Sequence, residues 1–376
     1  MSKLTPKLSD LVVTFVLFEV GSTTLFLLGG KAKQDAWLVM LIGAIFGFML
    51  VLLYLWIHRL DRSRDLFELL FYYLETLPGR IIGGLYVCYF LYEASRNLRD
   101  LGELTVLTLL NRTPIAFVML VAIVVISNTV RYGAEVLMQT CTALFPITVA
   151  GYALLLSLIA AAGMIHMENM LPILENGWKP VWDNAFPEVV SFPFGQTVLF
   201  LVLFKITEHS SGFSKAIIWA YSIVSFVLIL LNQISILVLG PELASNFTLP
   251  LLETVQLIRF PQILERMDAL FALILYLGLG IKIAAFFIAS VTGLHRITTI
   301  KYKLLIIPAA AVIYASSFLS PRYVEYVWAG LNLTVVWISP VFQIILPLML
   351  LTVMLLRKEK RSQTSQSTGA ERPNRI

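Results

Sequence analysis

The sequence predicts an all-α integral membrane protein with ten transmembrane helices in two halves of five, of which the first and sixth helices are broken. The first observation is composition, because 58% of the 376 residues are hydrophobic and only 14% are charged. A soluble globule of this size lacks the polar surface to balance that excess. The second is a series of ten apolar segments, and the third is an interruption at the same place in each half.

The ten segments have lengths near the roughly 20 residues that a spanning helix requires. They cover residues 11–29, 36–57, 81–110, 114–130, 137–162, 191–208, 214–239, 268–292, 303–320 and 331–356. We therefore expect one membrane domain at 1–361, with repeats at about 11–162 and 191–356 and an outer loop at 163–190. The polar, low-complexity residues 362–376 are expected to form a disordered cytoplasmic tail.

Basic residues predict the orientation of the chain. An even number of spans puts both termini on one side, and the basic cluster at 357–361 predicts that this side is cytoplasmic. The net charge of +5 has the same explanation, so a nucleic-acid partner is not expected. Cys88 and Cys141 lie in apolar runs and are expected to be small core residues.

Two apolar segments contain helix-breaking residues. Gly21-Ser22-Thr23-Thr24 interrupts the first segment, and Pro193-Phe194-Gly195-Gln196-Thr197 interrupts the sixth. Five spans in each half give the halves opposite orientations, which is typical of inverted-repeat transporters whose broken helices offer free backbone groups to a substrate or ion. The alternative is that these are ordinary membrane helices, in which Gly and Pro are common.

Ionisable residues inside the spans are candidates for function, because they are costly to bury. Glu19 lies near the centre of the first span and Lys282 near the centre of the eighth. If those helices are neighbours, each charge lowers the desolvation cost of the other, and the lysine stands where a coupling cation would otherwise bind. The alternative is that Lys282 pairs with another group or extends to water.

The third span carries a stripe of charges. Glu93, Arg96, Asp100 and Glu103 are spaced by 3, 4 and 3 residues, which places them on one helix face. A stripe facing lipid would be prohibitively costly, so it is expected to face the bundle interior or a hydrated cavity. It is interpreted either as a self-paired ladder that fixes helix packing or as a polar pathway for an ion.

The chain resembles the endospore germination permeases, the B subunits of nutrient germinant receptors in spore-forming bacteria, over about residues 5–356. Several short motifs carry the resemblance in order along the chain. They are G-x-x-x-L at 21–25, D-A-W at 35–37, L-L-N-R-T-P at 109–114, S-F-P-F-G at 191–195, E-R-M-D-A-L at 265–270 and the region 280–282. The resemblance implies an amino-acid permease of leucine-transporter type.

The resemblance also implies a function, partners and a location. A small nutrient, an amino acid, would bind a permease-like subunit in the spore inner membrane, with an A subunit and a C-subunit lipoprotein as partners. The implied ligand-binding residues are Gly21, Ser22 and Thr23 for its carboxylate, and Phe194, Gly195 and Thr197 around its side chain. Three positions depart from the family pattern: Thr23, Leu28 and Gln196 stand where members often have Gly, Pro and an acid.

The competing hypothesis is a secondary amino-acid transporter coupled to protons or a cation, because sensor and carrier need the same midplane site. A gene neighbourhood holding the two partner subunits would favour the receptor. No H-E-x-x-H, nucleophile elbow or P-loop motif occurs in the sequence. Neither an enzyme nor a cofactor or metal site is therefore expected.

Overall fold

A computed structural model describes residues 6–207, 212–258 and 267–370, with side chains up to residue 358. In these ranges every regular element is a helix. Two parts of the sequence argument fall partly outside them: the first two residues of the motif at 265–270, and the end of the predicted disordered tail. Because the last helix is drawn to Ala370 and its side chains beyond 358 are not described, that tail stays a prediction.

The helices follow one another with short connections. In the first half they are α1 (Leu8–Val20), η1 (Thr23–Leu25), η2 (Gly30–Asp35), α2 (Ala36–Leu60), α3 (Leu66–Tyr73), α4 (Thr76–Thr108), α5 (Ile115–Val130) and α6 (Ala134–Ala161). Then come η3 (Met167–Met170), α7 (Trp178–Asn184), η4 (Ala185–Val189), η5 (Phe194–Leu199), α8 (Phe200–Leu203), η6 (Phe204–Ile206), α9 (Phe213–Leu239), α10 (Pro241–Asn246) and α11 (Pro250–Gln256). The chain ends with α12 (Met267–Thr298), α13 (Tyr302–Ser316), α14 (Tyr323–Trp328), η7 (Ala329–Ile338), η8 (Val341–Ile345) and α15 (Leu346–Ala370).

Seven helical segments of the described chain are long and apolar enough to cross a membrane. They are Leu8–Leu25, Gly30–Leu60, Ala134–Ala161, Trp178–Ile206, Phe213–Leu239, Met267–Thr298 and Tyr323–Lys358. Two further apolar helices, α5 and α13, are shorter. The 33-residue α4 is long enough, and its charged stripe is what separates it from the seven. The chain is thus a multi-helix membrane protein.

The main difference from the expected spans concerns the stretch predicted as an outer loop at 163–190. The helical segment that contains the second break begins within it, at Trp178. Helix α7 is followed by η4, in which the backbone is kinked at Phe186 (φ −122°, ψ 129°) before the chain reaches the break.

Both predicted interruptions are present in the backbone. Helix α1 stops at Val20, and after a turn at Gly21 and Ser22 the chain continues only as the short 3-10 helix η1. In the sixth segment the helix stops before a turn at Phe192 and Pro193 and resumes as the 3-10 helix η5. These turns interrupt the regular helical hydrogen bonding, as Gly and Pro do in helix interiors.

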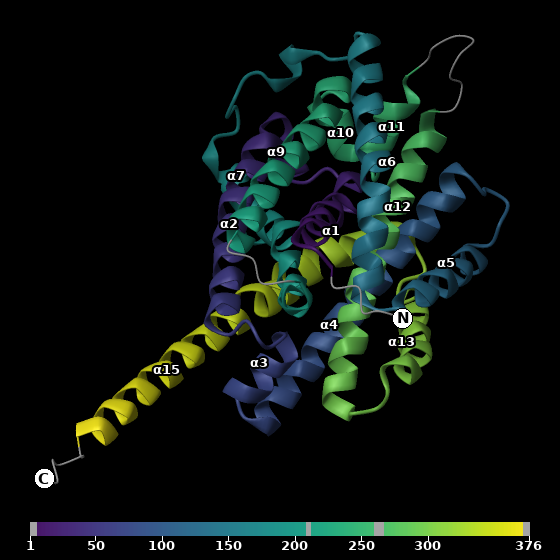
Figure 1. Cartoon of the computed structure of the whole chain (residues 1–376). Coiled ribbons are helices and arrows are strands. Elements are labelled where there is room, and N and C mark those ends of the chain that lie inside the picture. The colour runs from purple at the N-terminus through teal and green to yellow at the C-terminus, as the bar shows by residue number, and fades with distance from the viewer. Residues whose placement is uncertain (1–5, 208–211, 259–266, 371–376) are drawn as a thin grey trace, which may run out of the picture.

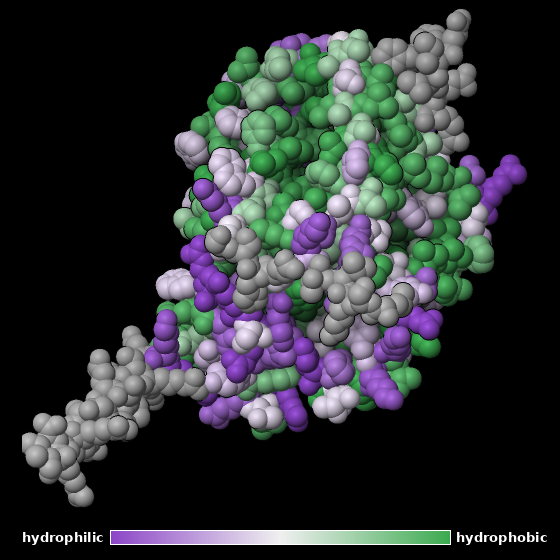
Figure 2. Space-filling model, in the orientation of Figure 1, coloured by the Kyte–Doolittle hydropathy of each residue, from purple (hydrophilic) through white to green (hydrophobic). Residues whose placement is uncertain are grey.

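The bundle has two distinct ends. Helices α10 and α11 lie at the end opposite α3, and α15 projects away from the α3 end (Figure 1). On the face drawn in Figure 2, hydrophobic residues cover most of the bundle and hydrophilic residues gather toward the α3 end. An apolar girdle with one polar end is what a bilayer-spanning bundle requires.

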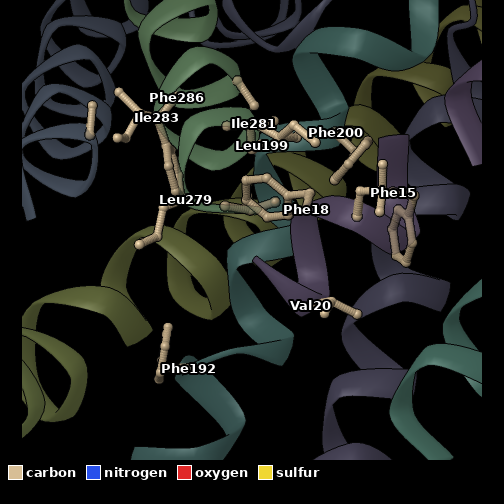
Figure 3. Packing of buried hydrophobic residues seen from close by; sticks show 14 of the residues in the cluster. Phe15, Phe18, Val20, Phe192, Leu199, Phe200, Leu279, Ile281, Ile283 and Phe286 are labelled. Carbon is tan, nitrogen blue, oxygen red and sulfur yellow. The ribbon is translucent and has the colours of Figure 1, made fainter. Parts of the chain in front are cut away.

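Aromatic packing holds the first half of the broken helix α1 against the rest of the bundle. The Phe18 ring lies 5.4 Å from that of Phe200 and 5.3 Å from that of Phe286, and Phe15 lies 4.7 Å from Phe200 (Figure 3). All four side chains are buried. They join α1, α8 and α12 into a tightly packed unit on the α3 side of the two breaks.

The prediction for the cysteines is confirmed for Cys141, which is buried, and wrong for Cys88, which is exposed. Cys88 shares its α4 face with the exposed residues Ile81 and Leu85 at spacings of 4 and 3. This face points out of the bundle, whereas the neighbouring Val87 and Tyr89 are buried, so the apolar run around Cys88 is shared between the core and an exposed face.

Candidate ligand site at the helix breaks

Lys282 from α12 joins the two helix breaks. Its side chain is fully buried, and its Nζ donates a 3.1 Å hydrogen bond to the Ser22 hydroxyl at the first break. The same Nζ lies 5.1 Å from the ring centroid of Phe18 and 5.0 Å from that of Phe192, which stands at the second break. Both distances suit cation–π attraction, so the ammonium is held by one hydroxyl and two aromatic faces.

Glu19 places an unsatisfied acid next to this lysine. Its side chain is fully buried, and within the described residues neither carboxylate oxygen has a hydrogen-bond partner. It interacts electrostatically with Lys282. The two residues predicted to be neighbours therefore lie in one buried environment, but the lysine makes its hydrogen bond to Ser22. A buried carboxylate without donors is expensive to keep, which makes it available to a ligand cation or a proton.

Gly21 allows two helices to touch. A Cβ at Gly21 would lie 2.8 Å from the carbonyl oxygen of Gly278, and one at Gly278 would lie 2.9 Å from the Cα of Gly21. Backbones approach this closely only where side chains are absent. Gly21, predicted as a ligand-binding residue, therefore has packing against α12 as its first role in this structure.

Among the described residues, the first break is tightly packed. The Thr23 hydroxyl donates to the Glu19 carbonyl at 2.5 Å, and the Thr24 hydroxyl lies 2.8 Å from that of Tyr152. A void beside them, lined also by Phe26 and Asn232, has a volume of only about 10 Å³. That is room for roughly one water molecule. Entry of a ligand therefore requires the surrounding segments to move.

The predicted residues at the second break make local or packing contacts. Phe194 packs against α2 at Gly47. A Cβ added to Gly47 would lie 2.4 Å from the Cβ of Phe194. Gly195 faces the amide of Gln343, and the Thr197 hydroxyl donates to the Phe194 carbonyl at 2.7 Å. All three predicted residues are buried. Of the six predicted ligand residues, Ser22 is the one to which Lys282 donates a hydrogen bond in the described part of the chain.

The charged stripe on α4 faces the interior, as predicted. Glu93, Arg96 and Asp100 are almost fully buried, and Glu103 is partly buried. The ion pair found here joins Arg99 to Glu103 at 2.7 Å.

The other members of the stripe contact neighbouring segments. Glu93 accepts a 2.7 Å hydrogen bond from the Gln196 amide, and Asp100 accepts one of 3.0 Å from the Tyr323 hydroxyl. The Arg96 guanidinium lies against the backbone of Gly330, where no Cβ fits. The ion pair of Glu103 is with Arg99, which lies outside the stripe, and the other three members connect α4 to the second break and to the last membrane segment.

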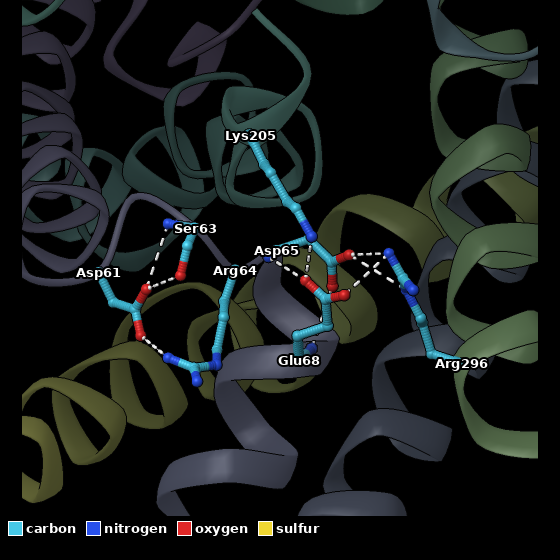
Figure 4. Close-up of polar contacts among 7 residues, drawn as sticks. All are labelled: Asp61, Ser63, Arg64, Asp65, Glu68, Lys205 and Arg296. Carbon is cyan, nitrogen blue, oxygen red and sulfur yellow. Dashed lines mark hydrogen bonds and ion pairs between the residues drawn. The ribbon is translucent and has the colours of Figure 1, made fainter. Parts of the chain in front are cut away.

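An ionic cluster, missed by sequence reasoning, joins the start of α3 to Lys205 and Arg296 (Figure 4). Asp65 and Glu68 cap α3 reciprocally, each accepting a 3.0 Å bond from the other's backbone N–H. Lys205 of η6 donates to Glu68 at 2.6 Å. Arg296 of α12 lies 3.0 Å from both Asp65 and Glu68. One capping box thus binds the inner part of the sixth segment to α12.

The two acids of this cluster have opposite pKa shifts. Burial raises the pKa of Asp65 above its ordinary value despite its bond to the Glu68 backbone and the charge of Arg296. Burial acts in the same direction on Glu68, but the Lys205 hydrogen bond and the Arg296 charge hold the pKa of Glu68 below its ordinary value. Glu68 is therefore the acid whose charge stabilises the cluster.

The groups around Lys282 match a small zwitterion. An ammonium and a hydroxyl suit a carboxylate, the free carboxylate of Glu19 suits an ammonium, and Phe18 and Phe192 suit an apolar side chain. No group of three metal-binding side chains forms among the residues that the structure describes. Sequence reasoning missed Phe192, although it lies inside the S-F-P-F-G motif, because only the turn places it over the lysine.

Comparison with known proteins shows which family the sequence resembles. A family model described as "Spore germination protein" matches residues 7–322. Spore germination protein KB of Bacillus subtilis (strain 168) is 31% identical over 366 residues, covering 97% of this chain and 98% of that protein. The putative spore germination protein YfkT of the same organism is 29% identical over 70% of this chain and 71% of its own. Spore germination protein B2 is 25% identical over 46% of each chain.

Proposed function

The chain belongs to the family of spore germination proteins, and from this premise we propose that it is the permease-like subunit of a spore germinant receptor. It binds a small nutrient, an amino acid, at the two helix breaks and so triggers germination. The observation that carries the proposal is the position of Lys282, which contacts Ser22 at one break and Phe192 at the other. A ligand that binds there acts on both broken segments at once.

The proposed architecture has ten spans in a five-plus-five inverted repeat of leucine-transporter type. The seven long apolar segments, the shorter α5 and α13, and the charged α4 together supply ten helical segments in the expected order. The breaks fall in the first and sixth of them. This pairing supports the repeat, because an offset of five segments between corresponding breaks reverses the orientation of the halves.

The ligand is recognised through charge at both of its ends. Its carboxylate binds the Lys282 ammonium and the Ser22 hydroxyl, and its ammonium binds Glu19. Each interaction gives a buried group that lacks a partner, or has too few, a charge-assisted hydrogen bond. Such a bond is roughly twice as strong as a neutral one. Phe18 and Phe192 enclose the ligand side chain. Gly21 contributes by allowing α12 to approach the break.

Binding changes the conformation of the subunit. The void beside the first break is about 10 Å³, so the ligand binds a more open state than the one described here. A ligand shifts such an equilibrium only as far as its affinities for the two states differ. We propose the A subunit and the C-subunit lipoprotein as partners in the spore inner membrane, and opening of this chain changes its contacts with them. Both termini of this chain are cytoplasmic in this arrangement.

Spores test this proposal directly. A strain lacking the gene is complemented with the wild-type chain or with Lys282→Met and exposed to each of the twenty common amino acids, with germination measured by loss of optical density. We expect one or more amino acids to germinate the wild-type complement and the Lys282→Met complement to respond at least tenfold more weakly. A full response of the variant to every nutrient would refute the site.

The alternative function is a proton- or cation-coupled amino-acid transporter. The free carboxylate of Glu19 beside Lys282 favours it, because a buried acid and base at the ligand site can exchange a proton with the transport cycle. Uptake of labelled amino acid into proteoliposomes distinguishes the two. Uptake driven by a pH gradient and lost in Glu19→Gln supports the transporter, whereas binding without uptake supports the receptor.

A further inference from the structure

A second cavity opens at the end of the bundle opposite α3. It is a cleft of about 370 Å³, within the range of roughly 300–1,000 Å³ typical of small-molecule sites. Its walls come from the segment after the first break, from η4 before the second break, from the connection between α10 and α11, and from α14 and η7. The lining side chains that matter here are Phe26, Lys31, Glu188, Asn246, Trp328 and Asn332.

An ion pair crosses this cleft between η2, at the start of the second segment, and η4, which precedes the second break. The Lys31 ammonium lies 3.0 Å from the Glu188 carboxylate. The Lys31 side chain is 63% exposed and that of Glu188 is 14% exposed. Water reaches the pair from the Lys31 side, and a ligand with both charges can replace it while pairing each group again. Its carboxylate then faces Lys31 and its ammonium faces Glu188.

The rest of the lining suits the same ligand class. The amide nitrogens of Asn246 and Asn332 already donate to backbone carbonyls of their own helices, so these residues offer the ligand their amide oxygens as acceptors. Trp328 and Phe26 supply apolar surface. A second base, Lys33, also lines the cleft but is paired with Glu242 at 2.6 Å. The Lys31–Glu188 pair and the aromatic walls therefore repeat the chemistry found around Lys282. An α-amino acid therefore fits both places.

Phe26 separates the cleft from the break. It lines the cleft and also the small void beside Thr23 and Thr24. Its ring meets that of Phe192 edge-on, with centroids 6.3 Å apart, and Phe192 in turn lies over Lys282. The path from the cleft to Lys282 is thus closed by two aromatic rings, one from each broken segment.

We propose that the cleft is an outer ligand site, which captures the amino acid between Lys31 and Glu188 before the Phe26–Phe192 pair opens to admit it to Lys282. This inference rests on the proposed function, since it takes the ligand class from it. Replacement of the Lys31–Glu188 contact by the ligand releases η2, which follows the first break, from η4, which precedes the second. Occupation of the outer site therefore favours opening of the inner one.

The first experiment detects the outer site by itself. The full-length protein in lipid nanodiscs carries Asn332→Cys as a probe and Cys88→Ser to remove the exposed native thiol. The rate of maleimide labelling is measured with each of the twenty common amino acids, in otherwise wild-type protein and with Lys282→Met added. We expect a germinating amino acid to slow labelling at least threefold in both backgrounds. Protection that disappears with Lys282→Met would overturn the outer site.

The second experiment tests the residues. Lys31→Gln/Glu188→Gln removes the bridging pair, and Arg322→Gln/Glu325→Gln is the matched control, since that pair is also exposed and does not line the cleft. We expect the first variant to lose protection and to bind labelled amino acid at least tenfold more slowly, and the control to behave as wild type. Unchanged protection and association in Lys31→Gln/Glu188→Gln would refute the inference.

A third variant tests the lid formed by the Phe26–Phe192 pair. Phe26→Ala removes one of the two rings, so exchange of labelled amino acid at the inner site should become at least threefold faster; an unchanged or slower exchange would contradict the lid.

The outcomes of these experiments also separate the outer site from the proposed function. Amino-acid binding that requires Lys282 but not the cleft leaves the proposed function standing and refutes the outer site, whereas absence of amino-acid binding to the wild type refutes both.

Discussion

The ammonium of Lys282 donates a 3.1 Å hydrogen bond to the hydroxyl of Ser22, which ties the middle of α12 to the turn that ends α1. Both side chains are buried, so the bond is made away from water. Hydrogen bonds between buried groups in a membrane bundle contribute about 0.6 kcal/mol on average. The larger consequence is one of position. The bond holds the lysine next to both helix breaks, so a change in the partner of its ammonium affects both of them.

The first prediction concerns Lys282 itself. Glu19→Gln/Lys282→Met removes both buried charges together, which replaces them by side chains of similar volume and is often neutral or stabilising. We expect an unfolding temperature in nanodiscs at or above that of the wild type, together with amino-acid affinity reduced at least tenfold, or about 1.4 kcal/mol. The measurements are a thermal melt and equilibrium binding.

Ser22→Ala is the graded companion of that variant, since it keeps both charges and loses one hydroxyl. We expect it to bind with an affinity between those of the wild type and the double variant. Wild-type affinity in Glu19→Gln/Lys282→Met would contradict a ligand role for the charged pair, whatever its stability.

The second prediction concerns the contact between Gly21 and Gly278. Gly278→Ala places a methyl group 2.9 Å from the Cα of Gly21, and neither backbone can yield without separating the helices. We expect a loss of about 1–3 kcal/mol of stability, the usual cost of overpacking. Gly280→Ala, two residues along the same helix, is the matched control because its Cβ meets no atom within 4 Å. Equal melting temperatures for the two variants would show that the contact is not tight.

The fold class and both breaks could be predicted from the sequence because they depend on local chemistry. Hydrophobic length predicted the membrane segments, and Gly21 and Pro193 marked the turns. The start of the sixth segment at Trp178 could not be predicted, since its tryptophans and prolines equally suit an interfacial loop. Only packing of η4 against its neighbours distinguishes the two.

The candidate site was less predictable, because its members come together from distant parts of the chain. Lys282 and Glu19 stand out as charges in apolar runs, but nothing local indicates that the lysine bonds Ser22 and lies under Phe192. The ionic cluster at Asp65 and Glu68 was missed for the same reason. Its capping pattern is visible at D-x-x-E, whereas its partner Lys205 comes from a helix far along the sequence.

The third prediction is a pH dependence at the ionic cluster. Glu68→Gln keeps a side-chain acceptor for the cap of α3 and loses the charge that binds Lys205 and Arg296. The pKa of Glu68 is lowered in the folded protein, so its stabilising contribution is complete above its ordinary value of 4.5 and is lost as the pH falls through the lower folded value. We expect the wild type to melt above Glu68→Gln from pH 7 to 5, with the gap closing below pH 4.5.

A control at an exposed acid isolates that effect. Glu325→Gln removes the charge of a residue whose side chain is 53% exposed and whose ion pair lies outside the cluster. Its melting temperature should stay close to that of the wild type over the same pH range. A gap for Glu68→Gln that is constant from pH 7 down to pH 3.5 would show that the charge of Glu68 does not stabilise the cluster.

The last prediction exchanges the partners of the hydrogen bond between Gln196 and Glu93. The Gln196 amide donates to the Glu93 carboxylate at 2.7 Å, and both side chains are buried. Gln196→Glu sets two carboxylates at that distance and should cost about 3 kcal/mol, as for other unpaired buried charges. Glu93→Gln/Gln196→Glu restores one amide and one carboxylate with their roles reversed, so it should recover most of the loss in a thermal melt. Additive losses in the double variant would mean that the two side chains act independently and that the α4 stripe is not coupled to the second break through this bond.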